Sequence, residues 1–166
     1  MISIRKAIPE DGLGIALVNV YTWKTTYAGL IPESFINSRI ENVMKIAERN
    51  RSEIAENNNY IVATVDNTIV GFACFGKVIE EEFTYEGTIH ALYVLSGFQG
   101  KGVGKMIFNA CIEELKNLGC NSLIVNCLKG NKSLEFYKHM GGKIIGKRED
   151  KVKDVVLTSD IIKLEI

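Results

Sequence analysis

The stretch TIHALYVLSGFQGKGVGKMIFNACIEELKNL, residues 88–118, decides the fold of this chain. It begins with a β-branched and aromatic run over residues 89–95, which is typical of a buried strand. It ends in a segment whose apolar side chains recur at helical spacing and therefore predict an amphipathic helix. These apolar positions are Val103, Met106, Ile107, Ala110, Cys111, Leu115 and Leu118.

A glycine-rich turn joins the expected strand to the expected helix. Gly100, Gly102 and Gly104 stand at alternate positions in it, with Lys101 and Lys105 beside them. Glycine lets the backbone adopt unusual dihedral angles and approach a ligand closely. The first turn of a helix offers unpaired N–H groups and the positive end of the helix dipole, which attract anions. We therefore expect this turn to hold a pyrophosphate.

Two common phosphate-binding motifs do not fit the spacing. A Walker-type loop needs one more residue before Gly104 and Lys105, and Met106 supplies no hydroxyl for magnesium. A dinucleotide fingerprint needs Gly-x-Gly-x-x-Gly close to the first strand, whereas this Gly-x-Gly-x-Gly run lies past the middle of the chain. The alternative is that this glycine-rich turn only connects the strand to the helix and binds no ligand.

Length and charge restrict the class of protein. The chain has 166 residues, and we expect one domain over residues 1–166. Its 20 basic residues balance its 20 acidic residues, whereas a general nucleic-acid binder carries a basic excess. No apolar run reaches the roughly 18 residues of a membrane span, and residues 1–20 lack the layout of a signal peptide. We expect a cytoplasmic protein that binds neither nucleic acid nor membrane.

The four cysteines, Cys74, Cys111, Cys120 and Cys127, lie inside apolar segments and form no C-x-x-C pair. Metal sites and disulfide frameworks have characteristic cysteine spacings that are missing here. We therefore expect reduced, buried thiols and no metal site.

Hydrophobic periodicity and turn residues predict the remaining elements. The expected strands cover residues 3–7, 60–65, 69–78, 89–95, 122–127, 143–148 and 152–164, with a turn at Asp66 and Asn67. The expected helices cover residues 9–26, 35–56, 103–118 and 131–140, with Ser34 as the cap of the second and Gly119 as the stop of the third. The second helix is expected to direct Ile36, Ile40, Val43, Ile46 and Ala47 inward.

The Gln-x-x-Gly-x-Gly pattern of residues 99–104, together with this order of elements, resembles the GNAT acetyltransferase superfamily. The resemblance covers nearly the whole chain. It implies an α/β (α+β) fold with a mixed, mostly antiparallel sheet of about seven strands and about four helices on both faces. It also implies that strands four and five, residues 89–95 and 122–127, splay apart so that a pantetheine arm lies between them.

The same resemblance implies acetyl-CoA as co-substrate. The helix after strand five contains Asn131 and Tyr137, which resemble the family's Asn-x-x-x-x-x-Tyr element. The residues implied to bind acetyl-CoA are Leu92, Tyr93, Val94, Gln99, Gly100, Lys101, Gly102, Val103, Gly104, Lys105, Asn131, Ser133 and Tyr137.

Tyr137 is the expected catalytic acid, because in relatives this hydroxyl lies beside the cofactor sulfur. An amine that attacks a thioester expels a thiolate, which a nearby acid can protonate. The reference pKa of tyrosine, about 10, exceeds that of a thiol, about 8.5, so stabilisation by hydrogen bonding counts alongside proton transfer. The alternative is that Phe136 and Tyr137 only pack.

The general base stays unassigned. Many relatives have a glutamate early in strand four, at the position where this sequence has Thr88. His90 is one candidate, with a reference pKa of about 6.5. Glu81, Glu82 and Glu86 are the others.

Trp23, Tyr27 and Glu82 are expected to bind the acceptor. The two aromatic residues belong to a segment that lines the acceptor pocket in relatives, and they could equally pack within a helix. Glu82 belongs to an acidic cluster with Glu80, Glu81 and Glu86, which would attract a positively charged amine or simply form a solvated loop.

The expected function is an N-acetyltransferase that moves an acetyl group from acetyl-CoA to a primary amine by direct attack in a ternary complex. The acceptor would be a small-molecule amine or a protein amine, and no metal is needed. The resemblance also suggests a homodimer. The alternatives are a non-catalytic acyl-CoA-binding sensor on the same fold, an interaction module whose glycine turn binds nothing, and transfer through Cys127 as a nucleophile.

Overall fold

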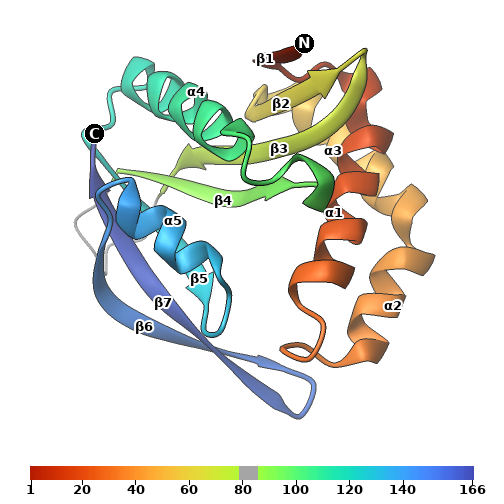
Figure 1. Ribbon diagram of the computed structural model, residues 1–166, viewed down its shortest axis with the longest axis vertical. Coiled ribbons are helices and arrows are strands. Elements are labelled where there is room, and N and C mark those ends of the chain that lie inside the picture. The colour runs from red at the N-terminus through yellow and green to blue at the C-terminus, as the bar shows by residue number, and fades with distance from the viewer. Residues whose placement is uncertain (79–85) are drawn as a thin grey trace.

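The computed structural model describes residues 1–78 and 86–166, and over these residues the chain builds one sheet of seven strands (Figure 1). The strands lie in the order β1-β2-β3-β4-β5-β7-β6. Neighbours pair antiparallel except β4 and β5, which run parallel. The mixed, mostly antiparallel sheet is therefore confirmed. The strands are β1 (Ile2–Lys6), β2 (Tyr60–Val65), β3 (Thr68–Lys77), β4 (Gly87–Val94), β5 (Ser122–Leu128), β6 (Lys143–Val152) and β7 (Val155–Glu165).

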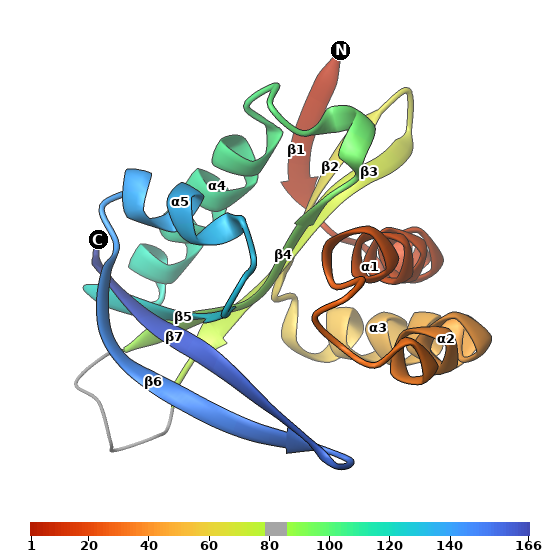
Figure 2. The same ribbon diagram turned by 60° about the horizontal axis from the view of Figure 1, so that its bottom comes forward.

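Helices cover both faces of this sheet (Figure 2). On one face lie α1 (Gly12–Thr26), α2 (Glu33–Glu41) and α3 (Val43–Asn57). On the other face lie α4 (Val103–Asn117) and α5 (Ser133–His139). Short 3-10 turns at Pro9–Asp11 and Ser96–Phe98 precede α1 and the glycine-rich turn.

The alternation of side chains along the strands fills a core on each face. On β2, Ile61 and Ala63 belong to the cluster under α4, whereas Tyr60 and Val62 belong to the cluster under α1 and α3. Successive side chains of a strand point to opposite faces, so a strand that is apolar throughout is buried on both sides. The stripe predicted for α4 is buried at Val103, Ile107, Cys111 and Leu115 and exposed at its rims, Met106 and Leu118.

The expectation of one long helix over residues 35–56 is wrong, because the chain forms two helices there. Asn42 separates α2 from α3, and its side-chain Nδ2 donates to the Ser38 carbonyl oxygen at 2.7 Å. An asparagine amide competes in this way with the backbone bonds that would continue a helix. Ser34 is not the cap, since α2 begins directly after Pro32. Ile40, at the end of α2, is exposed rather than directed inward.

The predicted turn at Asp66 and Asn67 and the predicted helix stop at Gly119 are confirmed, and all three residues have a positive φ. Asp66 and Asn67 have φ of 49° and 63° and connect β2 to β3. Gly119 has φ of 86° and ends α4.

The two central strands, β4 and β5, separate soon after they meet. Over the residues that the structure describes, they pair only at Gly87 with Leu123 and at Thr88 with Ile124. Beyond these rungs each strand keeps its other neighbour, β3 for β4 and β7 for β5. The splay that the resemblance implied is therefore present, and it opens the sheet in its middle.

The two outer strands differ in how they are covered. At one edge, β1 is tied to the rest of the fold by ion pairs of Arg5 with Asp11 and of Lys6 with Glu114, each at 2.6 Å. At the other edge, β6 pairs with β7 on one side only, and its side chains are exposed along almost its whole length. In Figure 2 the β6–β7 hairpin extends well beyond the helices.

Across residues 1–78 and 86–166, no helix combines the length and the apolar character needed to cross a membrane.

The close approach of α1 to α3 generates a stability prediction. A Cβ at Gly12 would lie 2.7 Å from the Ala47 carbonyl oxygen and 3.2 Å from the Arg51 amide nitrogen. Both obstacles are backbone atoms, so Gly12→Ala should lower the free energy of unfolding by about 1–3 kcal/mol, although alanine favours a helix by about 1 kcal/mol. Urea unfolding measures this.

Gly97→Ala is the matched control, because a Cβ at Gly97 meets nothing within 4 Å. It should change the free energy of unfolding by no more than about 0.5 kcal/mol. Equal effects of the two substitutions would contradict the packing described between α1 and α3.

Candidate functional site

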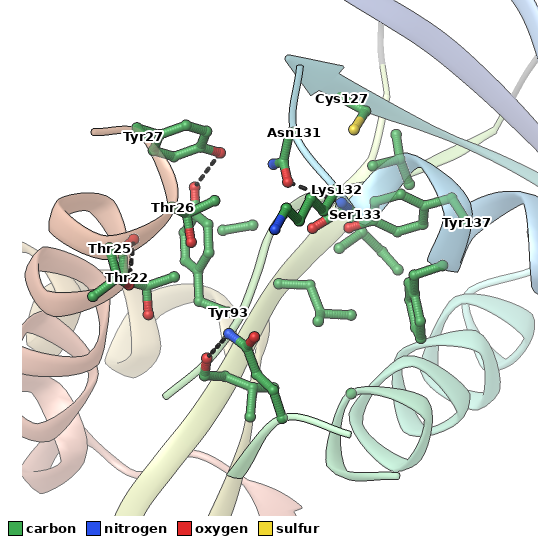
Figure 3. A pocket seen from close by; sticks show the side chains of 18 of the residues that line it. Thr22, Thr25, Thr26, Tyr27, Tyr93, Cys127, Asn131, Lys132, Ser133 and Tyr137 are labelled. Atoms are coloured by element: carbon green, nitrogen blue, oxygen red, sulfur yellow. Dashed lines mark hydrogen bonds between the residues drawn. The ribbon is translucent and has the colours of Figure 1, made fainter. Parts of the chain in front are cut away.

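A cavity of about 890 Å³ lies where β4 and β5 diverge. Its walls come from β4 and β5, from the glycine-rich turn and the start of α4, from α5, and from the end of α1 with the loop that follows (Figure 3). Segments that are far apart in the sequence therefore meet around the opening in the sheet.

The glycine-rich turn forms one end of this cavity. Gly100 and Gly102 have φ of 71° and 80°, values that L-residues with side chains rarely adopt. Helix α4 begins directly after Gly102, and no side chain among the described residues caps it. The N–H groups of its first turn therefore remain available to an anion. Gly104 and Lys105, in that turn, line the cavity.

Three residues predicted for the turn act within the protein itself. The Gln99 side chain lines the cavity, and its Nε2 donates to the Val94 carbonyl oxygen at 2.8 Å, which fixes the turn to the end of β4. Lys101 does not line the cavity, because its Nζ donates to the Gly97 carbonyl oxygen at 2.9 Å. Val103 is buried in the core under α4.

Strand β4 brings Leu92, Tyr93 and Val94 to the cavity, as well as His90. In the ladder with β3, Cys74 pairs with Ala91 and Phe75 with Ile89, so His90 is the extra residue of a β-bulge. His90 is exposed, but nearby protein atoms partly desolvate its ring, which lowers the pKa of the imidazole from its ordinary value, while the charge of Glu53 opposes this shift. The imidazole is therefore neutral and able to accept a proton at neutral pH.

Helix α5 contributes the second predicted group. Asn131 Oδ1 accepts a hydrogen bond from the Ser133 amide at 2.9 Å, and both residues line the cavity. The Tyr137 ring packs against Phe136 and Phe108, with centroids 5.2 and 6.4 Å away, and points from α5 into the cavity (Figure 3). Tyr137 is only 6% exposed, and this burial raises the pKa of its hydroxyl. The phenol therefore keeps its proton at neutral pH.

The end of α1 forms the opposite wall. The hydroxyl oxygens of Tyr27 and Tyr93 lie 3.4 Å apart, and both residues line the cavity. Trp23 lies behind Tyr27 rather than in the lining, with ring centroids 4.9 Å apart. The Arg39 guanidinium covers the Trp23 ring at 4.1 Å from its centroid. Of the two predicted aromatic residues, the structure brings only Tyr27 to the cavity and gives Trp23 a supporting place.

The acidic candidates do not meet in the described part of the site. Glu80, Glu81 and Glu82 lie outside the residues that the structure describes. Glu86 accepts a hydrogen bond from the Asn121 amide and does not line the cavity. Of the candidates for the base that the sequence indicates, His90 is the one that lines the cavity in the described ranges.

The cysteines do not offer a reactive thiolate. All four are free and buried, as expected. Cys127 lines the cavity, but burial raises the pKa of its thiol to about 11, with Asp160 adding to the shift. Because the thiolate is the nucleophilic form, Cys127 is poorly suited to attack a thioester at neutral pH. Within the described ranges, no group of three or more His, Cys, Asp or Glu side chains is placed to hold a metal ion.

Two groups of lining residues were not predicted. Thr22, Thr25 and Thr26 line the cavity from the end of α1, and their i, i+3, i+4 spacing places them on one helix face, which is a signal that the sequence did contain. Lys132 and His139 line it from α5 and its start. A single lysine or histidine in a short helix carries no pattern, so sequence reasoning had no signal for these two.

Two comparisons of the sequence with known proteins give matches. The sequence model of a family described as the Acetyltransferase (GNAT) family matches residues 21–141. A protein of Bacillus subtilis (strain 168) named an uncharacterized N-acetyltransferase, YuaI, is 30% identical over 138 residues, which are 83% of this chain and 78% of that protein.

Solved structures share the fold. The crystal structure of PaiA N-acetyltransferase from Thermoplasma acidophilum, in complex with coenzyme A, has a TM-score of 0.78 at 23% identity and covers 100% of this chain and 99% of that one. The structure of yncA from Salmonella typhimurium, with its cofactor acetyl-CoA, has a TM-score of 0.72 at 16% identity and covers 99% and 94% of the two chains.

The environment of His90 generates a titration prediction. Because the protein disfavours its charged form, the imidazole should titrate with a midpoint below about 6.5. The unfolded chain then binds this proton more readily than the folded chain, so protonation of His90 favours unfolding. The contribution of the neutral imidazole to the free energy of unfolding is therefore complete above about pH 6.5 and is lost as the pH falls through the folded pKa. Proton NMR measures the midpoint.

Spectra of His90→Gln identify the His90 signals by their loss. The same variant should also show a smaller fall in the free energy of unfolding as the pH drops below 6.5. A midpoint at or above about 6.5 would mean that the bulge leaves this side chain fully solvated.

Proposed function

This chain belongs to the acetyltransferase (GNAT) family, and from that premise we propose that it transfers an acetyl group from acetyl-CoA to a primary amine by direct attack in a ternary complex. The observation that carries the proposal is the opening between β4 and β5. It has a helix start suited to phosphates at one end and a buried, protonated phenol at α5.

The phosphate end would be held by α4 and its turn. The first-turn amides of α4 have no intrahelical partners, as in any helix, and the positive φ values of Gly100 and Gly102 form the tight turn that leads into them. Lys105, exposed in the same turn, adds a positive charge beside those amides. This arrangement suits a pyrophosphate, which carries negative charge on closely spaced oxygens.

The opened strand would hold the pantetheine arm. Beyond Thr88, the edge of β4 that faces β5 has no strand partner among the described residues, so the peptide groups near Leu92 and Tyr93 can bond to a ligand amide. Asn131 uses its Oδ1 within the protein, which leaves its Nδ2 as a donor toward the cavity. An extended chain with amide groups matches such a row of backbone donors and acceptors.

The chemistry would place Tyr137 at the leaving group. Acetyl-CoA supplies an activated acetyl thioester, and in the transfer a carbon–nitrogen bond forms while the carbon–sulfur bond breaks. The Tyr137 phenol holds its proton because burial raises its pKa, so it can donate a hydrogen bond or the proton to the departing sulfur. His90, neutral at pH 7, can take up the proton that the amine loses.

The experiment that tests this function is release of a free thiol from acetyl-CoA in the presence of a panel of primary amines, run at several pH values. Amine-dependent thiol release is the expected result. Coenzyme A binding without thiol release from any amine would instead indicate a binding module.

Within that assay, Tyr137→Phe should lower kcat by about tenfold or more, the low end of what general acid catalysis contributes. Its affinity for acetyl-CoA should change little, because the ring and its packing are retained. Tyr21→Phe is the control, since Tyr21 is 60% exposed and lies outside the cavity lining. An unchanged kcat for Tyr137→Phe would remove the phenol from the mechanism.

Gly104→Ala separates ligand binding from folding. A Cβ at Gly104 would meet Phe136 no closer than 3.8 Å, which is ordinary contact, and the residue lies in a helix. The free energy of unfolding should therefore stay the same or rise by up to about 1 kcal/mol. The added methyl group would stand in the first turn that faces the phosphates, so the Kd for coenzyme A should rise about tenfold or more.

Calorimetry measures this Kd, with Gly97→Ala as a control outside the cavity lining. Unchanged coenzyme A affinity in Gly104→Ala would place the pyrophosphate somewhere other than this turn.

A further inference from the structure

The described lining of the cavity carries positive charge and no acidic side chain. Of the residues that line it in the ranges 1–78 and 86–166, none is Asp or Glu, whereas Lys105 and Lys132 are both present. Lys105 stands beside the first turn of α4, where the proposed function uses it for phosphates. Lys132 has no part in that scheme.

Lys132 is the residue just before α5. Figure 3 shows its ammonium group reaching across the cavity toward the side where Thr26, Tyr27 and Tyr93 lie. The ion pairs found among the described residues do not include Lys132, whereas Lys138 of α5 pairs with Glu135 at 3.5 Å. A cation is therefore directed at the part of the cavity that the acceptor would use.

A second cation lies behind the same wall. Arg39 is partly buried, its Nη2 donates to Asn19 Oδ1 at 2.5 Å, and its Nε is buried without a hydrogen-bond partner among the described residues. The Arg39 guanidinium covers the Trp23 ring, whose centroid lies 4.9 Å from that of Tyr27, so the cation stands one ring behind this phenol. Burial and the charge of Arg49 lower the pKa of Arg39, whereas Tyr93 and Tyr27 oppose that shift. A partly buried charge without a carboxylate partner contributes a positive field to the wall next to it.

The neutral groups on this wall suit an anion as well. The hydroxyls of Tyr27 and Tyr93 lie 3.4 Å apart and can both donate hydrogen bonds to a third oxygen. Thr26 is drawn beside them in Figure 3. Hydroxyl donors combined with an ammonium group match the oxygens of a carboxylate or a phosphate, whereas a second ammonium group on the acceptor would meet like charge.

We propose that the acceptor is an amine that also carries an anionic group, a carboxylate or a phosphate, and that Lys132 recognises this group. The inference rests on the proposed function, because it names the class of amine that the same cavity accepts. It differs from the expectation that the acidic residues 80–82, which lie outside the described residues, attract a positively charged amine. The bonds formed and broken stay those of acetyl transfer.

Matched pairs of amines test the charge of the acceptor. Thiol release from acetyl-CoA is measured with L-phenylalanine and its carboxamide, with L-glutamine and its carboxamide, with O-phosphoethanolamine and ethanolamine, and with spermidine. The members of each pair share the amine and differ by an anionic group. In at least one pair, kcat/KM for the anionic member should be at least about tenfold that for its partner. Which pair shows the difference tells whether the enzyme prefers a carboxylate or a phosphate.

Variants at Lys132 test the residue. Lys132→Gln should raise the KM of the preferred anionic amine about tenfold or more and leave the KM of acetyl-CoA within about twofold. Lys132→Arg should keep most of the preference, and Lys132→Glu should shift it toward the neutral and cationic amines. Lys138→Gln is the matched control on the same helix, because Lys138 does not line the cavity. Since Lys132 is exposed, all of these variants should fold, which thermal unfolding checks.

Three results would overturn the inference. The first is equal or better turnover of the neutral members or of spermidine, and the second is a rise in the KM of acetyl-CoA rather than of the amine in Lys132→Gln. Both of these leave acetyl transfer itself intact. The third, no thiol release with any of these amines at saturating acetyl-CoA, would overturn the proposed function and this inference together.

Discussion

The incomplete ladder between β4 and β5 is the constraint on which the rest of the structure depends. Two rungs, at Gly87 and Thr88, hold the strands together, and beyond them the peptide groups of both strands face a gap. A buried peptide group without a partner costs about 1–3 kcal/mol, so such a gap needs water or a ligand to meet it. The bulge at His90 increases the local twist of β4, and the bond from Gln99 to the Val94 carbonyl fixes the far end of the strand. The elements whose side chains line the cavity are those whose ends reach this gap.

Much of the fold could be predicted because its strongest signals are local. The alternate glycines mark a turn through residue type alone, and the φ of 80° at Gly102 shows why glycine is needed there. The order of strands and helices followed from periodicity and from the resemblance that it supported. The break at Asn42 could not be seen, because the apolar spacing continues on both sides and the competing bond to Ser38 depends on a side-chain conformation. The exposure of Ile40 is a consequence of that break.

The site could be predicted only where its residues belong to a motif. Tyr137 was expected because its position relative to Asn131 resembles the family's Asn-x-x-x-x-x-Tyr element, and both residues line the cavity. Trp23, in the last turns of α1, and Tyr27, the residue after that helix, are four residues apart and look equivalent in the sequence. In the structure, Arg39 packs over Trp23 and only Tyr27 lines the cavity. Lys132 was not predicted, because it reaches the cavity through the direction of its side chain, which no spacing along the chain encodes.

The free edge of β6 bears on how this protein behaves at high concentration. A strand with unpaired N–H and C=O groups along one edge is a template on which another chain can add. Strand β6 is such an edge strand, and it is ten residues long. Five consecutive charged residues, 147–151, occupy the second half of that strand and are exposed. Any chain that docked there would have to strip water from both signs of charge, so the strand resists edge-to-edge aggregation. The charged residues of the exposed β6–β7 hairpin thus oppose edge-to-edge pairing without a helix that covers the strand.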